Sequence, residues 1–406
     1  MRIPLASSGL RQVDIEIATN VLNSGNLTMG TQVKLFEATM ASYLGSKEFV
    51  MMNSGSSANL AMIEALMRPA KSKPKLYMGD GVLVPAIAWP TTVWPIIQLG
   101  LKPYFVDVDQ NTLAMDLIKA QSLINASKGL IKAMFPIHPL GYAIPPNELE
   151  AFALRNELIL INDVCESLGS WSGNKHAGTS GIAGSFSFYF SHHITTMEGG
   201  GVATDDPNFA DDLRSIRSHG WSRDRKDVDD WHEKISDNDA KFLFVSTGYN
   251  IRPMEIQAAI GISQMKDIDK FIVKRRAIAM AVKKALAGTI INLIDGGMSD
   301  SEENYRGHSW MLIALQVTGV NPTQVKKLVV ADLEKFEIET RPPLTGNFLS
   351  QPAMRRVDGV FQTPESFDVA ISLTNTTFLI GAHHDLTPDQ VKYLCEKLAF
   401  VAKKYK

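Results

Sequence analysis

Residues 158–164 read L-I-L-I-N-D-V, a short apolar run that ends at the carboxylate of Asp163. Apolar runs without polar alternation are typical of strands buried on both faces of a parallel sheet. In open α/β sheets, groups that bind ligands gather at the carboxyl ends of the strands. Asp163 is therefore a candidate ligand-binding residue, although capping of the next turn explains a carboxylate here equally well. Glu166 follows three residues later as a second carboxylate.

Similar apolar runs lie on both sides of this segment, and segments with helical spacing separate them. The other runs are 82–84, 103–108, 130–137, 186–190 and 201–204. The helical segments among them are 57–68, 146–155 and 208–218. Alternation of this kind predicts an α/β fold with a sheet buried on both faces.

The pattern changes after residue 265. Residues 267–287 predict a long, charged helix, 309–317 a strand and 321–336 another helix. The last helix opens at Thr387 with a capping pattern. We expect a large domain over 1–265 and a smaller α+β domain over 266–406, with the N-terminal segment packing on the smaller one.

Composition excludes several classes of protein. The chain has 406 residues, 45% hydrophobic and 21% charged, with a formal charge of -2, which gives no electrostatic case for nucleic acid or a membrane surface as a partner. Residues 82–101 carry no charge, but Pro85, Pro90 and Pro95 would break a membrane helix, so we expect a buried strand followed by a loop. Only two cysteines occur, which favours a reducing cytoplasm and excludes a four-cysteine iron–sulfur cluster.

Two further stretches carry candidate binding residues. The segment N-S-G-S-S-A-N at 53–59 leads into a helix, where open backbone N–H groups suit a phosphate, and simple helix capping by serine is the alternative. Trp89 follows the strand at 82–84. It is either a core residue or a platform that stacks on a flat heteroaromatic ring.

A third stretch, S-F-Y-F-S-H-H at 187–193, contains two adjacent histidines. Neighbouring residues on a strand point to opposite faces, so we do not expect His192 and His193 to bind one metal ion together. No metal site is predicted. A base or a buried, hydrogen-bonded histidine both remain open from this stretch alone.

Taken in order, these stretches resemble the sugar-aminotransferase family of fold-type I pyridoxal-phosphate (PLP) enzymes, which modify nucleotide-linked keto sugars. The resemblance covers nearly the whole chain and rests on the ordered combination. It implies a large domain with a mixed, mostly parallel sheet flanked by helices and a smaller C-terminal α+β domain. The matching stretches are S-G-S-S-A (54–58), P-A-I-A-W (85–89), F-V-D-V-D (105–109), D-V-C-E (163–166), S-F-Y-F-S-H-H (187–193), E-G-G-G-V-A-T-D-D (198–206), R-S-H-G (217–220) and G-Y-N-I-R-P-M-E-I-Q-A-A (248–259).

One position departs from the family pattern. Ordinary members have a lysine after S-F-Y that holds PLP covalently, whereas this chain has His192 and no lysine between Lys175 and Lys226. The H-H-I-T-T-M-E-G-G pattern is similar to the 3-dehydratases of deoxysugar synthesis. An imidazole makes no stable covalent link to the cofactor, so the resemblance implies untethered PLP that persists as pyridoxamine phosphate (PMP). It also implies that His192 is the base acting at the cofactor's methylene carbon.

The resemblance assigns the other roles residue by residue. Asp163 would pair with the pyridine nitrogen, Trp89 would stack on the ring, and Glu166 would lie near the 3-hydroxyl. The phosphate would be held by Gly55, Ser56, Ser187 and, from the neighbouring subunit of a homodimer, Asn250. His219 and Arg341 are candidates for binding the substrate or the carboxylate of the amino donor.

The implied reaction is removal of the C3 hydroxyl from a nucleotide-linked 4-keto-6-deoxyhexose, with L-glutamate as amino donor and release of ammonia. GDP is the expected nucleotide by resemblance alone. A related CDP-sugar enzyme uses an iron–sulfur cluster, which two cysteines cannot ligate. The alternatives are a nucleotide-sugar aminotransferase and a catalytically silent protein that binds nucleotide sugars. Retention of Asp163, Trp89 and Glu166 beside the lost lysine argues against the silent protein.

Overall fold

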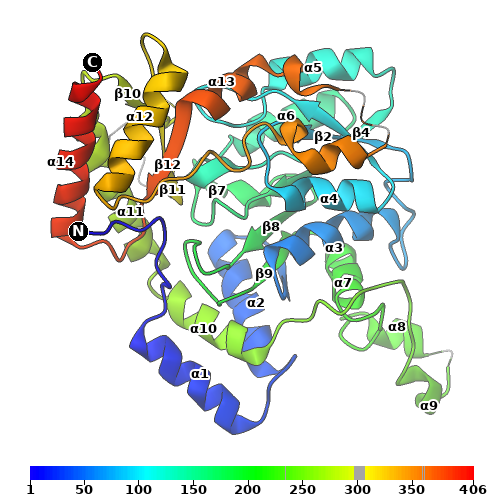
Figure 1. The fold of residues 1–406 in the computed structure, drawn as a ribbon. Coiled ribbons are helices and arrows are strands. Elements are labelled where there is room, and N and C mark those ends of the chain that lie inside the picture. The colour runs from blue at the N-terminus through cyan, green and yellow to red at the C-terminus, as the bar shows by residue number, and fades with distance from the viewer. Residues whose placement is uncertain (234, 297–306, 359, 361) are drawn as a thin grey trace.

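The large domain is built on a seven-stranded sheet with the order β1-β9-β8-β5-β4-β2-β3. The computed structural model describes residues 1–233, 235–296, 307–358, 360 and 362–406 (Figure 1). Strands β8 to β3 in that order are parallel, whereas β9 is antiparallel to both β8 and β1. The predicted mixed, mostly parallel sheet is therefore confirmed. The strands are β1 (Glu48–Met52), β9 (Gly200–Thr204), β8 (Ala183–Ser187), β5 (Ile159–Asp163), β4 (Ile131–Met134), β2 (Gly81–Pro85) and β3 (Lys102–Val106).

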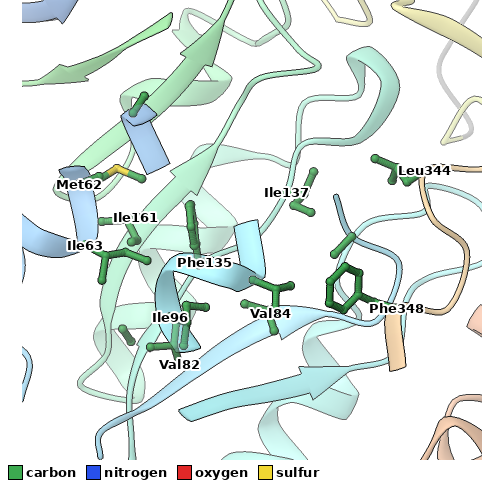
Figure 2. Close-up of a cluster of buried hydrophobic side chains, with 14 of the residues drawn as sticks. Met62, Ile63, Val82, Val84, Ile96, Phe135, Ile137, Ile161, Leu344 and Phe348 are labelled. Carbon is green, nitrogen blue, oxygen red and sulfur yellow. The ribbon is translucent and has the colours of Figure 1, made fainter. Parts of the chain in front are cut away.

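Helices cover both faces of this sheet, which explains the continuous apolar runs of its strands. Val82 and Val84 of β2 pack in one cluster with residues of α3 and α4 (Figure 2). Leu83, between them, points into a different cluster with α5 and α6 on the opposite face. The helices that precede residue 266 are α1 (Gln12–Ser24), α2 (Thr31–Leu44), α3 (Gly55–Met67), α4 (Pro90–Gln98), α5 (Leu117–Ala126), α6 (Pro146–Arg155), α7 (Pro207–Ile216), α8 (Val228–His232), α9 (Asp237–Ala240) and α10 (Glu255–Met265).

The C-terminal part contains a separate antiparallel sheet with the order β10-β11-β12. Helices α11, α12 and α14 supply apolar residues to a core around this sheet, which Figure 1 shows at one side of the molecule. This is the smaller α+β unit that the sequence predicts. Its elements are α11 (Ile268–Leu286), β10 (Ile291–Leu293), β11 (Leu312–Val317), α12 (Pro322–Lys335), α13 (Asp368–Thr376), β12 (Thr377–Gly381) and α14 (Pro388–Lys404).

The N-terminal segment crosses onto this smaller unit. Ile3 forms a parallel bridge with Ile338, and the Leu5 N–H donates to Glu339 at 3.0 Å. The Ser7 hydroxyl donates to Asp385 at 2.5 Å. The boundary proposed at residue 265 falls at the end of α10, and the first residues after it lead directly into α11. Within the described residues, none of the helices combines the length and apolar character needed to cross a bilayer.

The loop predicted after β2 is wrong, because residues 90–98 form helix α4. Pro90 occupies the first turn, where its missing N–H is tolerated. Pro95 lies inside the helix and cannot donate to the carbonyl of Thr91, four residues earlier. The side-chain amide of Asn59, in α3, donates to that carbonyl at 3.1 Å instead. A neighbouring helix thus replaces the hydrogen bond that proline removes.

The strand predicted at 186–190 is also shifted, since β8 covers Ala183–Ser187. By composition, the glycine-containing residues 183–185 are typical of a loop. In the strand, however, Gly184 lies against the backbone of Gly178, where an added Cβ would come within 2.4 Å of the carbonyl oxygen, so glycine is required there. Consequently His192 and His193 lie in the turn after β8, and the expectation based on strand alternation does not apply to them. Their surroundings differ nonetheless, since only His192 lines the large cavity at the ends of β5 and β8.

Candidate active site

A cavity of about 630 Å³ lies where β5 and β8 end, in the size range of small-molecule sites. Eight of the predicted site residues line it together. Residues from four other segments complete the wall, including Leu5 and Ala6 of the N-terminal segment. The eight are Gly55, Ser56, Trp89, Asp163, Glu166, Ser187, His192 and Arg341.

The N-terminus of α3 forms one end of the cavity. The Ser54 hydroxyl caps the Ser57 N–H at 3.1 Å, while the N–H groups of Gly55 and Ser56 have no acceptor among the described residues. A Cβ at position 55 would lie 2.5 Å from Cβ of Ser187. Only glycine therefore permits this approach, which leaves a helix N-terminus and the Ser187 side chain side by side. Such a cradle suits a phosphate group.

Asp163 at the end of β5 is buried and bound by three donors. One carboxylate oxygen accepts from the Thr92 hydroxyl at 2.7 Å and the Asn59 amide at 2.9 Å. The other accepts from the Cys165 N–H at 3.1 Å. The arrangement presents an anionic acceptor to the cavity, as a protonated ring nitrogen requires.

Asn59 is in turn fixed by its neighbours. Its side-chain oxygen accepts from Ser185 at 2.5 Å, and its amide group bonds both Asp163 and the Thr91 carbonyl that Pro95 leaves free. Because Pro95 leaves the Thr91 carbonyl free for Asn59, it helps to orient the side chain that binds Asp163. Asn59 and Thr92 were not among the site residues expected from the sequence. Their only signals were two polar residues at the starts of helices that flank a predicted ligand-binding strand.

Trp89, Glu166 and Arg341 also line the cavity. Trp89 is the residue before α4 and is 47% exposed, so it is not the core residue that the alternative interpretation predicted. Its ring remains available for stacking. The Glu166 carboxylate accepts the Leu140 N–H at 3.0 Å and lies 4.0 Å from an Arg341 nitrogen. Burial raises the pKa of Glu166, and the charge of Arg341 opposes that effect.

His192 lies in the turn after β8 with its ring against the cavity. Its Nδ1 lies 2.5 Å from the carbonyl oxygen of Cys165, which can only accept a hydrogen bond. Nδ1 must therefore carry the proton, and in the neutral ring Nε2 carries the lone pair. Burial lowers the pKa of His192 to about 4, and the charges of Arg341 and Arg275 act in the same direction. At neutral pH the ring is thus an unprotonated base.

No lysine lines this cavity among the described residues. Lys175 lies in a hairpin of β6 (Trp171–Ser172) and β7 (Lys175–His176), where its ammonium pairs with Glu150 at 2.9 Å. His219 and Asn250 lie outside the cavity, both exposed, on neighbouring segments joined by the Ser218–Asn250 bridge. Over the part of the chain that the structure describes, no group of three or more His, Cys, Asp or Glu side chains could hold a metal ion.

These residues fit PLP or PMP. The glycine-lined helix N-terminus suits its phosphate, the locked Asp163 carboxylate suits its ring nitrogen, and the exposed Trp89 ring suits its flat face. The fold and this cavity together define a PLP-dependent enzyme of fold type I.

Comparisons with known proteins give the family. The sequence profile of the DegT/DnrJ/EryC1/StrS aminotransferase family matches residues 10–399, and the chain belongs to this family. GDP-4-keto-6-deoxy-D-mannose 3-dehydratase from Escherichia coli O55:H7 is 37% identical over 397 residues, which cover 97% of this chain and 99% of that protein. The protein of that name from Yersinia pseudotuberculosis is 39% identical over 403 residues, or 97% of each chain.

Solved structures agree with the sequence matches. GDP-4-keto-6-deoxymannose 3-dehydratase with a trapped PLP–glutamate geminal diamine is 35% identical and superimposes with a TM-score of 0.88, over 98% of this chain and 100% of that one. The same enzyme has been solved as a mutant with GDP-perosamine bound, at the same TM-score and identity. The predicted family and fold type are confirmed.

Proposed function

We propose that this protein is a PLP/PMP-dependent 3-dehydratase that removes the C3 hydroxyl of a nucleotide-linked 4-keto-6-deoxyhexose, GDP-4-keto-6-deoxymannose in particular. Glutamate is the amino donor. Overall, the keto sugar and glutamate give the 3,6-dideoxy-4-keto sugar, 2-oxoglutarate and ammonia, which balances atoms and electrons. The observation that carries the proposal is a neutral imidazole, His192, in a PLP-type cavity that contains no lysine among the described residues.

His192 is suited to move a proton and unsuited to hold the cofactor. The Cys165 carbonyl fixes the proton on Nδ1, so Nε2 accepts the proton that elimination of the C3 hydroxyl requires. The lowered pKa keeps that nitrogen unprotonated at neutral pH. A lysine amine would instead bond to the cofactor and complete amino transfer.

The other residues bind and orient the cofactor. When bound, PMP supplies an amine that condenses with the 4-keto group and a ring that accepts electrons. Asp163 would hold the ring nitrogen protonated, Trp89 would pack on the ring face, and the N-terminus of α3 at Gly55 would bind the phosphate. Glu166 would lie near the 3-hydroxyl, and Arg341, 4.0 Å from Glu166, would bind a carboxylate such as that of glutamate.

The substrate and donor are supported by the relatives. Both curated relatives are named for GDP-4-keto-6-deoxy-D-mannose, and the solved relatives hold a glutamate adduct of PLP in one case and GDP-perosamine in another. We infer the same nucleotide and donor for this chain. We also infer a cytosolic setting, since Cys165 and Cys395 are both free thiols in this structure.

We further propose a homodimer in which Asn250 reaches the phosphate of the partner's cofactor. Asn250 is exposed and does not line the cavity of its own chain. The segments that carry it also expose a stack of aromatic rings, with Trp221 lying 5.5 Å from Phe242 and 6.1 Å from Phe244 between ring centroids. Phe242 and Phe244 are more than half exposed, as expected of a surface that a partner buries.

The decisive experiment presents the purified protein with PLP, glutamate and a panel of nucleotide-linked 4-keto-6-deoxy sugars. We expect loss of one oxygen from the GDP-linked sugar, detected by mass, together with ammonia and 2-oxoglutarate. Retained nitrogen at C4 would identify an aminotransferase. Absence of any spectral change of PLP with glutamate, in correctly folded protein, would identify a silent binding protein.

A second experiment tests His192 itself. After borohydride treatment, the wild-type protein should carry no covalently bound cofactor, whereas His192→Lys should carry a reduced pyridoxyl group at position 192 and lose dehydration. His232→Lys, on α8 outside the cavity, is the matched control and should behave as wild type. A pyridoxyl-lysine peptide from the wild-type protein would contradict the proposal.

A further inference from the structure

A second, small cavity is lined by His192 and its neighbours in the loop after β8. It has a volume of about 10 Å³, the space of a single water molecule. Segments from every part of the chain meet there: the N-terminal segment, the turn after β8, α10, α11 and the loop after β12. Its polar lining includes His193, Arg275, His383 and His384.

Arg275 brings a buried positive charge to this cavity, and the carboxylate of Asp385 acts on it only from beyond ion-pair distance. Its side chain is 1% exposed, and its terminal nitrogens donate to the carbonyls of Met311 at 3.0 Å and His192 at 3.1 Å. Its Nε has no partner, and no carboxylate within ion-pair distance of it is found among the described residues. Buried charges are normally paired, because an isolated charge is costly to remove from water.

Three imidazoles surround this charge with unused hydrogen-bonding capacity. His193, His383 and His384 are each at most 5% exposed, and neither ring nitrogen of any of them has a hydrogen-bond partner in the described structure. Asp385 is the nearest acid to His384, at 3.6 Å, but it is half exposed and is engaged by Ser7. Each neutral ring has one N–H to offer. Together with Nε–H of Arg275, these rings bring four buried N–H groups to the cavity lining, although the backbone of Ser309 also acts on His193 and that of Pro4 on His383.

We propose that this cavity binds a single-atom inorganic anion, chloride under ordinary conditions, held by Arg275 and the three imidazoles. A water molecule would satisfy the imidazoles but leave the charge of Arg275 uncompensated, whereas a halide ion accepts several donors and supplies the missing charge. The space for about one water molecule favours a single-atom anion over a polyatomic one. His192 lines both this cavity and the active-site cavity. The Arg275 guanidinium also binds the carbonyl of His192.

The first test uses the wild-type protein alone. Crystals grown or soaked in bromide should show one anomalous peak in this cavity. In solution, replacing gluconate by chloride at constant ionic strength should raise Tm by a few degrees, saturably, because a ligand that binds only the folded state stabilises it. A water molecule in the bromide crystals together with a Tm that ignores chloride would overturn the proposal.

Variants then locate the effect. Arg275→Met should abolish the chloride-dependent rise in Tm, whereas Lys274→Met, which removes an exposed positive charge from the same helix, should retain it. His384→Phe keeps an aromatic ring on Phe271, 3.8 Å away between centroids, and removes one donor, so chloride should bind about fivefold more weakly. Equal chloride dependence in Arg275→Met and wild type would place the ion elsewhere.

Discussion

The Asp163→Asn substitution tests the centre of the proposed cofactor site. The Asp163 carboxylate accepts hydrogen bonds from the Thr92 hydroxyl at 2.7 Å, the Asn59 amide at 2.9 Å and the Cys165 N–H at 3.1 Å. Asparagine has the same shape but replaces one oxygen by an NH2 group. If its oxygen keeps the bonds from Thr92 and Asn59, the NH2 group faces the Cys165 N–H, and the reverse orientation opposes two donors.

The size of the effect follows from these contacts. A buried donor left unsatisfied costs about 1–3 kcal/mol of folding stability. Loss of the charge-assisted bond to the ring nitrogen costs about 1.5–3 kcal/mol of cofactor binding, which corresponds to about 10- to 150-fold weaker affinity. Thr92→Val is the graded control. It removes one donor and leaves the charge, so we expect a loss of about fivefold.

The assay is titration of cofactor-free protein with PLP and PMP by absorbance, with the rate of the glutamate half-reaction as a second readout. We expect the order wild type, Thr92→Val, Asp163→Asn in both measurements. An Asp163→Asn protein that binds PMP within twofold of wild type and reacts with glutamate at the same rate would refute the pairing of Asp163 with the ring nitrogen.

Three further predictions follow from the described contacts. Gly55→Ala places a Cβ 2.5 Å from Ser187 and should weaken phosphate binding and lower Tm, whereas Ser56→Ala, at an exposed position, should preserve Tm. Trp89→Phe should retain most of the PLP affinity that Trp89→Leu loses, measured by the same titration, and equal losses would exclude stacking. Acid should destabilise the fold: burial lowers the pKa of His138 to about 4 and of His176 and His308 to about 3. The unfolded chain therefore binds more protons than the folded one below about pH 6.5. As the pH falls, each such histidine lowers the free energy of unfolding by about 1.4 kcal/mol per pH unit until its folded pKa is reached. Urea midpoints that stay constant from pH 7 to pH 5 would contradict this.

The sequence predicts the order and type of the main elements because burial on two faces leaves a clear apolar signature. It misplaces α4 and β8 for opposite reasons. Proline argues against a helix, but residues 90–98 are helical. The side chain of Asn59, more than thirty residues earlier, donates to the Thr91 carbonyl that Pro95 cannot bind. Glycine argues against a strand, but at 183–187 it is required by the close approach of residue 178. Both signals are local, and both are overridden by tertiary contacts.

The candidate site shows the same limit. Residues that face a ligand carry chemistry that a sequence pattern can reveal, and eight of them line one cavity. The residues that hold these side chains in place carry no such pattern. Asn59 and Thr92 are ordinary polar residues near helix starts, and only the structure shows that both donate to Asp163. The pairing of Arg275 with the carbonyl of His192 joins residues 83 positions apart, and no spacing rule reports such a contact.

The stretch that ends β5 therefore does more than supply an acid. Asp163 offers the carboxylate, Glu166 a second one, and the carbonyl of Cys165 between them fixes the proton of His192 on Nδ1. A lysine at position 192 would need no such support, because its amine bonds to the cofactor directly. A histidine acts as a base only if one nitrogen is kept free. The Cys165 carbonyl holds the proton on Nδ1 and so keeps Nε2 free. A histidine in place of the lysine therefore depends on a backbone group 27 residues away as much as on position 192 itself.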